Sequence, residues 1–254
     1  MAAVENGLKA VVIDLYDTLV NWNPEALPKF EWRGREIRST APLFLSELEA
    51  ALGERFDREA FMAAHDAVAL EIHSARSGDE PVEITCLERF SRTLDRAGFT
   101  GAEADALADR IRRIHMGRIR EITYAPPERI AAMKKIARRY RVGLISNFDD
   151  AETGELIVRD TGLHELFDVA IISARAGLRK PHPLIFRRAL DAMRVEPHEV
   201  LYVGDTPNDD VKGAKRAGMR SAWIRRKDRE LPEDIPAPDI IINDLAELPE
   251  KLGL

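Results

Sequence analysis

Several short apolar runs of this chain lead into side chains that can bind ions or react. A carboxylate can hold a cation or attack an electrophilic phosphorus or carbon atom, and a lysine can supply positive charge to an anion. These side chains are Asp14, Ser146 with Asn147, Lys180, and Asp205 with Asp209 and Asp210. An isolated acid after a strand often only caps a helix, so the signal lies in their order and spacing together.

The hydrophobic pattern indicates which elements would position these residues. From Pro126 onward, short apolar runs alternate with helical patterns, which is typical of a parallel sheet covered by helices on both faces. The expected strands are residues 9–14, 142–146, 169–173, 200–204, 221–224 and 239–242. Ligands bind beyond the carboxyl ends of the strands in such a sheet, and the reactive side chains fall at those ends.

The first strand is separated from the others by a long helical block. Apolar residues recur there at three- and four-residue spacing, which predicts helices over 43–52, 61–75, 84–98 and 102–122. The block therefore reads as a helical bundle inserted after strand one, with 21–28 as the outgoing connection and 123–127 as the return. The predicted fold class is α/β.

Composition excludes several classes of protein. The formal net charge of −6 disfavours a general nucleic-acid binder, which needs a basic face. The single cysteine, Cys86, rules out an internal disulfide and favours a reducing cytoplasm. The N-terminus lacks a signal-peptide layout, and no apolar run approaches the ~20 residues of a membrane span. We therefore expect a cytoplasmic protein without membrane or nucleic-acid partners; the sequence leaves the oligomeric state open.

The motifs resemble those of the haloacid dehalogenase-like hydrolase superfamily. The matching segments are IDLYDTLV (13–20), LISN (144–147), GLRKPHPLIF (177–186) and VGDTPNDDVKGAKRAGM (203–219). The resemblance covers the whole predicted sheet domain. It implies a Rossmann-like parallel-sheet catalytic core, residues 1–20 and 125–254, with the inserted α-helical bundle, residues 21–124, as a cap domain.

The resemblance also implies a role for each matching residue. Asp14 takes the place of the nucleophile, and Lys180 supplies positive charge to the substrate anion. Ser146 and the backbone amide of Asn147 would receive phosphate oxygens. A Mg²⁺ ion would be held by Asp14, the carbonyl of Tyr16, Asp205 and Asp210; the alignment favours Asp210 over Asp209 as the outer acid.

Tyr16 departs from the pattern of the family's phosphatases. Most of them carry a second aspartate at this position, which protonates the leaving group and later activates water. Tyrosine has a reference pKa near 10, so it can donate a hydrogen bond at pH 7 but is a poor base. The family's 2-haloacid dehalogenases carry tyrosine here, because their halide leaving group needs no proton.

The acids after the fourth strand favour phosphate chemistry. The metal-free dehalogenases lack the acid that corresponds to Asp205. Several carboxylates facing Asp14 without a cation would repel one another and an anionic haloacid, so they imply a cation and a phosphate-like substrate. We therefore expect a metal-dependent hydrolase that acts on a small phosphorylated metabolite through an aspartyl-phosphate intermediate, with water activation impaired by Tyr16.

Two alternatives stay open at this point. One is a 2-haloacid dehalogenase-type enzyme, for which Arg33, Arg35 or Arg38 would bind the halide, although surface charge is the commoner explanation of these arginines. The other is a non-catalytic descendant that binds a metal or a phosphorylated ligand. Retention of Asp14, Lys180 and Asp205 weighs against it.

Overall fold

The computed structural model describes residues 7–77, 80–226 and 230–254 of the chain. These residues form two compact units. The first, here called the sheet unit, comprises the described residues of 7–21, 80–83, 124–226 and 230–254, and the second, the helical unit, comprises 22–77 and 84–123. Among the described residues, none of the helices combines the length and apolar character that a bilayer-spanning helix needs.

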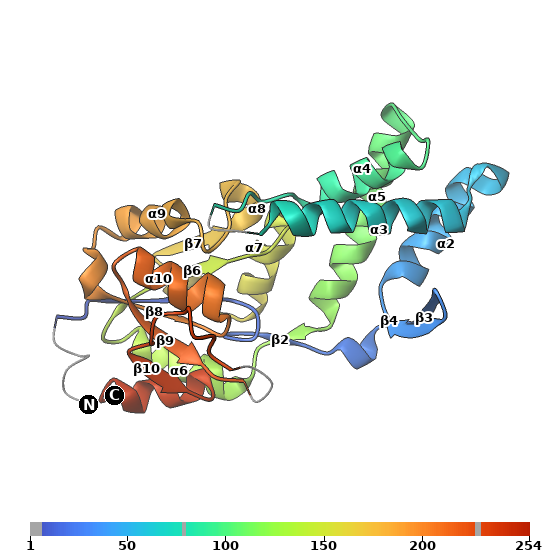
Figure 1. The fold of residues 1–254 in the computed structure, drawn as a ribbon. Coiled ribbons are helices and arrows are strands. Elements are labelled where there is room, and N and C mark those ends of the chain that lie inside the picture. The colour runs from blue at the N-terminus through green and yellow to red at the C-terminus, as the bar shows by residue number, and fades with distance from the viewer. Residues whose placement is uncertain (1–6, 78–79, 227–229) are drawn as a thin grey trace. The chain divides into compact units, whose positions relative to one another are not determined.

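The sheet unit is built on six parallel strands (Figure 1). Their spatial order is β10-β9-β8-β1-β6-β7, so β1 lies in the middle although it comes first in the chain. The strands are β1 (Ala10–Ile13), β6 (Arg141–Ser146), β7 (Val169–Ile172), β8 (Val200–Gly204), β9 (Arg220–Ile224) and β10 (Ile240–Ile242). The parallel α/β fold predicted from the alternating apolar runs is confirmed.

Helices cover both faces of this sheet. Val11 and Ile13 of β1 pack into one core cluster, and Ala10 and Val12 pack into another on the opposite face. A strand buried on both faces must be apolar at every position, which explains the unbroken run before Asp14. The helices of this unit are α6 (Pro127–Ile136), α7 (Ala151–Asp160), α8 (Ser173–Ala176), α9 (Pro183–Met193), α10 (Gly213–Arg216) and α11 (Leu248–Lys251).

Short helical turns lie between the helices and strands of both units. They are 3₁₀ turns at Pro24–Ala26, Gly53–Arg55, His164–Leu166, Pro197–Glu199 and Leu245–Glu247, and a π-helical turn at Pro207–Lys212. The π-helical turn follows β8 and carries Asp209 and Asp210, so its geometry decides which of these acids faces Asp14.

The helical unit contains the four helices that the apolar spacing predicts. They are α2 (Ala41–Leu52), α3 (Arg58–Ala75), α4 (Cys86–Arg96) and α5 (Ala102–Glu121). Asp57 caps α3 by accepting from the N–H of Ala60 over 3.0 Å, and Thr85 caps α4 by accepting from that of Glu88 over 3.2 Å. Such caps satisfy backbone donors that have no partner within the helix.

Two pairs of short strands lie in the block that the sequence showed as helical. An antiparallel hairpin joins β3 (Lys29–Trp32) and β4 (Arg35–Arg38). The two-residue strands β2 (Asn21–Trp22) and β5 (Thr123–Tyr124) pair where the chain leaves the sheet unit and returns to it. Segments this short carry too few alternating residues for the pattern to reveal them.

A segment from the middle of the helical block groups with the sheet unit. Val82 forms an isolated antiparallel bridge with Leu178, and the N–H of Glu83 donates to the Gly177 carbonyl over 3.4 Å. The sequence had placed residues 80–83 within the block 21–124, because a tertiary contact of four residues leaves no periodic signal. This contact brings Glu83 into the sheet unit.

The core of the helical unit encloses an imidazole. The ring of His65 lies 6.1 Å from each of the rings of Phe44 and Phe90. Burial and, to a smaller extent, the nearby charge of Arg89 lower the pKa of His65 to about 4, because both disfavour the imidazolium.

This shift predicts a pH dependence of stability. The imidazole has a pKa of 6.5 when unfolded and about 4 when folded, so the unfolded chain binds the proton first. The contribution of His65 is complete above pH 6.5 and is lost as the pH falls toward 4, at a cost on the order of 1–3 kcal/mol. The midpoints of thermal unfolding of the wild type and of His65→Gln, measured from pH 7.5 to 4.5, should therefore differ less at low pH than at high pH. The exposed His198 supplies the control, His198→Gln; equal pH profiles for all three proteins would contradict the prediction.

Candidate active site

Asp14 stands directly after β1, at the carboxyl edge of the sheet. Its N–H donates to the carbonyl of Val203 on β8 over 2.9 Å, and that of Asp17 donates to the Val20 carbonyl over 2.7 Å. The chain turns at Asp17, whose φ is 60°. The carboxylate of Asp17 pairs with Arg226 at 2.5 Å. The structure therefore gives Asp17 a basic partner.

Lys180 lies between two of the acids. Its Nζ is 2.7 Å from Oδ1 of Asp14, 2.7 Å from Oδ1 of Asp210 and 2.9 Å from the hydroxyl of Tyr202. Only 2% of the side chain is exposed. Burial alone would lower the pKa of Lys180, but the charges of Asp14 and Asp210 raise it well above its ordinary value. The ammonium group therefore stays charged at the centre of the site.

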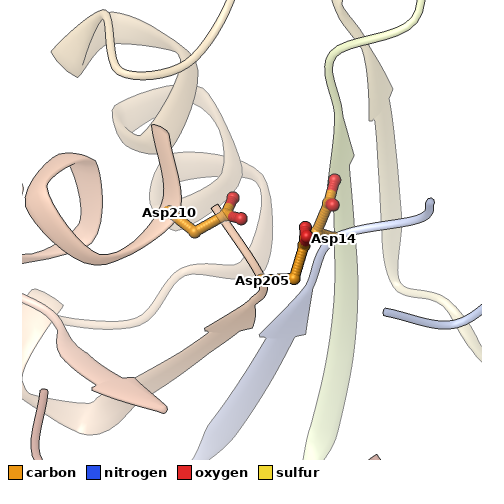
Figure 2. A group of neighbouring side chains, drawn as sticks. All are labelled: Asp14, Asp205 and Asp210. Carbon is orange, nitrogen blue, oxygen red and sulfur yellow. The ribbon is translucent and has the colours of Figure 1, made fainter. Parts of the chain in front are cut away.

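Three carboxylates converge at this point (Figure 2). Asp14, Asp205 and Asp210 are buried, and each offers an oxygen within 4.8 Å of those of the other two. The N–H of Thr206 donates to Oδ2 of Asp210 over 2.8 Å, and the indole of Trp223 donates to the carbonyl of Asp205 over 3.0 Å. Hydrogen bonds to and beside the acids thus fix the part of the chain that carries them.

Gly204 makes room for the outermost acid. A Cβ at this position would lie 2.2 Å from Cγ of Asp210, far inside van der Waals contact. The glycine that ends β8 is therefore required by the close approach of the Asp210 carboxylate. Asp209 points elsewhere, since its Oδ2 accepts from Nδ2 of Asn147 over 3.0 Å. The geometry supports the choice of Asp210 over Asp209.

The cluster gathers more carboxylates than ammonium groups among the described residues. Burial, together with the charges of Asp210 and Asp205, raises the pKa of Asp14 to about 7 despite the opposing charge of Lys180. Lys180 contacts Asp14 and Asp210, and Asp205 adds a third buried carboxylate to the cluster; gathering buried carboxylates in this way is costly. Hard oxygen ligands in this number suit Mg²⁺, so the residues fit a divalent cation.

Ser146 ends β6, and Asn147, which follows it, contacts the Lys180 backbone. Oδ1 of Asn147 accepts from the backbone N–H of Lys180 over 2.7 Å, and Nδ2 donates to the Lys180 carbonyl over 3.0 Å. The side chain of Asn147 therefore fixes the loop that carries the lysine. The sequence assigned only its backbone amide a role; an asparagine at a strand end was the available signal for this clamp.

Tyr16 packs its ring against a neighbour. The rings of Tyr16 and Phe148 stack with their centroids 5.4 Å apart and an interplanar angle of 15°. Tyr16 also lines a cavity of about 210 Å³ with the acids, Asn147, Arg179 and Lys180. The tyrosine thus has a packing partner in addition to its place in the wall of the site.

Sequence patterns did not reveal Arg179 in this wall, or two residues that contact its lining from behind, Tyr202 and Glu83. Tyr202 is buried in β8, and its hydroxyl contacts Lys180 and, over 3.2 Å, Oδ1 of Asp210; a phenol in a central strand was its only signal. Arg179 and its partner Glu83 are far apart in the chain. No local pattern could join them.

Two of the three arginines considered for a halide site, Arg33 and Arg38, bind acids of their own unit. Arg33 lies 3.2 Å from Asp66, and Arg38 lies 3.1 Å from Glu25. These contacts agree with the explanation of these side chains as surface charge.

A comparison with known proteins decides the family. The family model described as haloacid dehalogenase-like hydrolase matches residues 8–218. The chain belongs to this family. It is therefore a hydrolase of the haloacid dehalogenase-like type, as the motifs at the strand ends indicate.

Relatives of this hydrolase include both phosphatases and dehalogenases. A phosphoserine phosphatase of Thermus thermophilus is 33% identical over 254 residues, covering 95% of this chain and 98% of the relative. A glyceraldehyde 3-phosphate phosphatase of Pyrococcus abyssi is 40% identical over 86 residues, 34% of this chain and 36% of the relative. The crystal structure of a 2-haloacid dehalogenase from Pseudomonas syringae superposes with a TM-score of 0.72 at 27% identity, covering 97% of this chain and 98% of that one.

The space beside Gly204 supplies a test of the acid cluster. Gly204→Ala should displace the Asp210 carboxylate, lower the free energy of unfolding by about 1–3 kcal/mol and weaken Mg²⁺ binding at least about tenfold, as measured by calorimetry. Gly117→Ala is the matched control, because a Cβ there meets no atom within 4 Å and alanine favours the helix. Wild-type Mg²⁺ affinity in Gly204→Ala would contradict the role of Asp210.

Proposed function

We propose that this hydrolase is a Mg²⁺-dependent phosphatase of small phosphorylated metabolites that works through an aspartyl-phosphate intermediate. The observation that carries the proposal is the set of three buried carboxylates, Asp14, Asp205 and Asp210, with ligand oxygens within 4.8 Å of one another. Phosphate esters are anions, so they enter such a site only when positive charge exceeds that of Lys180 alone.

The cation has a defined place in this proposal. Asp14, Asp205, Asp210 and the carbonyl of Tyr16 would hold it. When bound, Mg²⁺ neutralises the carboxylates, keeps Asp14 ionised and polarises the phosphoryl oxygens.

The chain's own residues then perform the transfer in two steps. The carboxylate of Asp14 attacks phosphorus, so that an oxygen–phosphorus bond forms while the bond to the leaving alcohol breaks. Lys180, held at 2.7 Å from Oδ1 of Asp14, and the backbone amide of Asn147 with Ser146 stabilise the charge on the phosphoryl oxygens. Water then attacks phosphorus, releases phosphate and restores Asp14.

Tyr16 sets the rate in this scheme. Its hydroxyl can donate a hydrogen bond to the leaving oxygen, but a phenol near pKa 10 transfers its proton poorly and cannot activate water at pH 7. Both proton transfers therefore fall largely to solvent. We expect a slow phosphatase that works best on esters with good leaving groups.

A second candidate is dehalogenation of a 2-haloacid. It is favoured by Tyr16 and by the similarity to the Pseudomonas syringae 2-haloacid dehalogenase. In that reaction Asp14 would attack carbon and expel a halide, which needs no proton. The retained Asp205 and Asp210 count against it, because they add negative charge beside an anionic substrate.

Metal dependence separates the two candidates. The purified protein should release phosphate from an aryl phosphate ester only with Mg²⁺, and excess EDTA should abolish the release. Asp14→Asn should lower kcat by a factor on the order of 10³ or more, because an amide cannot attack phosphorus. Phosphate appearance measured colorimetrically checks both expectations.

Two controls accompany this experiment: a variant of an exposed acidic residue, and an assay for halide release. Asp191→Asn changes an exposed acid on α9 and should leave the rate as in the wild type. Chloride release from 2-chloropropionate that EDTA does not affect would overturn the phosphatase proposal in favour of dehalogenation.

Replacing Tyr16 tests whether the site lacks a general acid and base at this position. Tyr16→Asp should raise kcat for phosphate esters by roughly 10- to 100-fold, since a carboxyl group at this position can protonate the leaving oxygen and activate water. Stopped assays with an alkyl phosphate, whose leaving group most needs a proton, give the clearest readout.

Tyr16→Asn is the matched control for this variant. It removes the stack on Phe148 and has the shape of aspartate without its proton chemistry. If Tyr16→Asn is accelerated as much as Tyr16→Asp, or if neither is, Tyr16 does not stand in for a proton shuttle.

A further inference from the structure

Two of the described residues that line the cavity beside Asp14 are basic, and they do different things. Lys180 is bound at its tip by Asp14, Asp210 and Tyr202. Arg179 immediately precedes it, yet its guanidinium is held by another partner. Lys180 holds the acids and acts on the phosphoryl group in the proposed mechanism. Arg179 takes part in neither task, so its position in the cavity needs a separate explanation.

A buried carboxylate orients Arg179. Nη1 of Arg179 lies 3.1 Å from Oε1 and 3.3 Å from Oε2 of Glu83, and the Glu83 side chain is 0% exposed. The hydroxyl of Ser173 donates to Glu83 and accepts from the N–H of Phe148 over 2.9 Å. The guanidinium is thus braced from the ends of β6 and β7.

The ion pair of Arg179 and Glu83 contributes little to the net stability of the fold. Desolvation of a buried ion pair offsets most of its Coulomb attraction, so hydrophobic residues of the same volume would serve the fold as well. A guanidinium fixed in the wall of a cavity is, however, well suited to bind an anion, because its planar fork offers five N–H donors and can keep one partner while it binds another.

Arg179 and Asp209 both line the cavity beside Asp14. Asp209 binds Asn147 and stands outside the group of Asp14, Asp205 and Asp210. Arg179 is therefore placed to contact the part of a substrate that extends beyond the phosphoryl group.

We propose that Arg179, oriented by Glu83, is a specificity-determining residue that binds a carboxylate on the leaving group of the substrate. The inference rests on the proposed phosphatase function and narrows it to phosphate monoesters of small hydroxy acids.

A matched pair of substrates tests this assignment. Phosphoglycolate and ethyl phosphate have the same chain length, with a carboxylate in one replacing the methyl group of the other. With Mg²⁺, kcat/KM of the wild type should favour phosphoglycolate by at least about tenfold, the worth of one charge-assisted hydrogen-bonded pair. Arg179→Met should bring this ratio close to one, and Arg179→Lys, which keeps the charge but loses the planar fork, should give an intermediate ratio.

A binding measurement separates failure of this inference from failure of the proposed function. Calorimetry with phosphonoacetate and ethylphosphonate, in the presence of Mg²⁺, requires no turnover. Arg179→Met should weaken binding of phosphonoacetate at least about tenfold more than binding of ethylphosphonate. If the wild type hydrolyses neither these esters nor the aryl phosphate, the proposed phosphatase function fails, and the binding ratio alone decides the role of Arg179.

Three results would overturn the assignment. They are a wild type without preference for the carboxylate ligand, an Arg179→Met variant that loses both ligands equally, and one that loses neither. Should Arg179→Met fail to fold, as judged by its circular dichroism, an unchanged ratio in Arg179→Lys contradicts the proposal in the same way.

Discussion

The excess of buried negative charge around Lys180 is the constraint on which the site depends. One ammonium group lies 2.7 Å from both Asp14 and Asp210, and Asp205 adds a third carboxylate to the cluster. The fold accepts this arrangement only because the strand ends hold the acids in place, with Gly204 giving Asp210 its space and Asn147 clamping the lysine loop. A chain that keeps so costly a cluster must use it, and binding a divalent cation is the use that its oxygen ligands suit.

The same constraint resolves the conflict between Tyr16 and the acids. A tyrosine after the nucleophile suits a leaving group that needs no proton, whereas the carboxylates suit an anionic substrate neutralised by a cation. The stack of Tyr16 on Phe148 shows how a large ring is accommodated by packing. No comparable packing can accommodate a surplus of buried acids, so the carboxylates are the stronger guide to the reaction.

Much of this architecture could be predicted from the sequence because it is periodic. Strands such as β1, buried on both faces, leave continuous apolar runs, and helices α2 to α5 leave spacings of three and four residues. The roles assigned to Asp14, Lys180 and Asp205 rest on the motifs that follow those runs and on the family resemblance that the motifs carry. What could not be predicted depends on tertiary contacts without local pattern: the brace of Glu83 on Arg179, the hydroxyl of Tyr202 on Lys180, and the short hairpin of β3 and β4.

A crystal grown with manganese, which substitutes for Mg²⁺ and scatters anomalously, tests the central claim most directly. The account predicts an anomalous peak among the carboxylates of Asp14, Asp205 and Asp210, each in contact with the ion, while Lys180 keeps its contact with Asp14. Absence of a peak at saturating manganese, with Lys180 still the sole cation among the three acids, would contradict it.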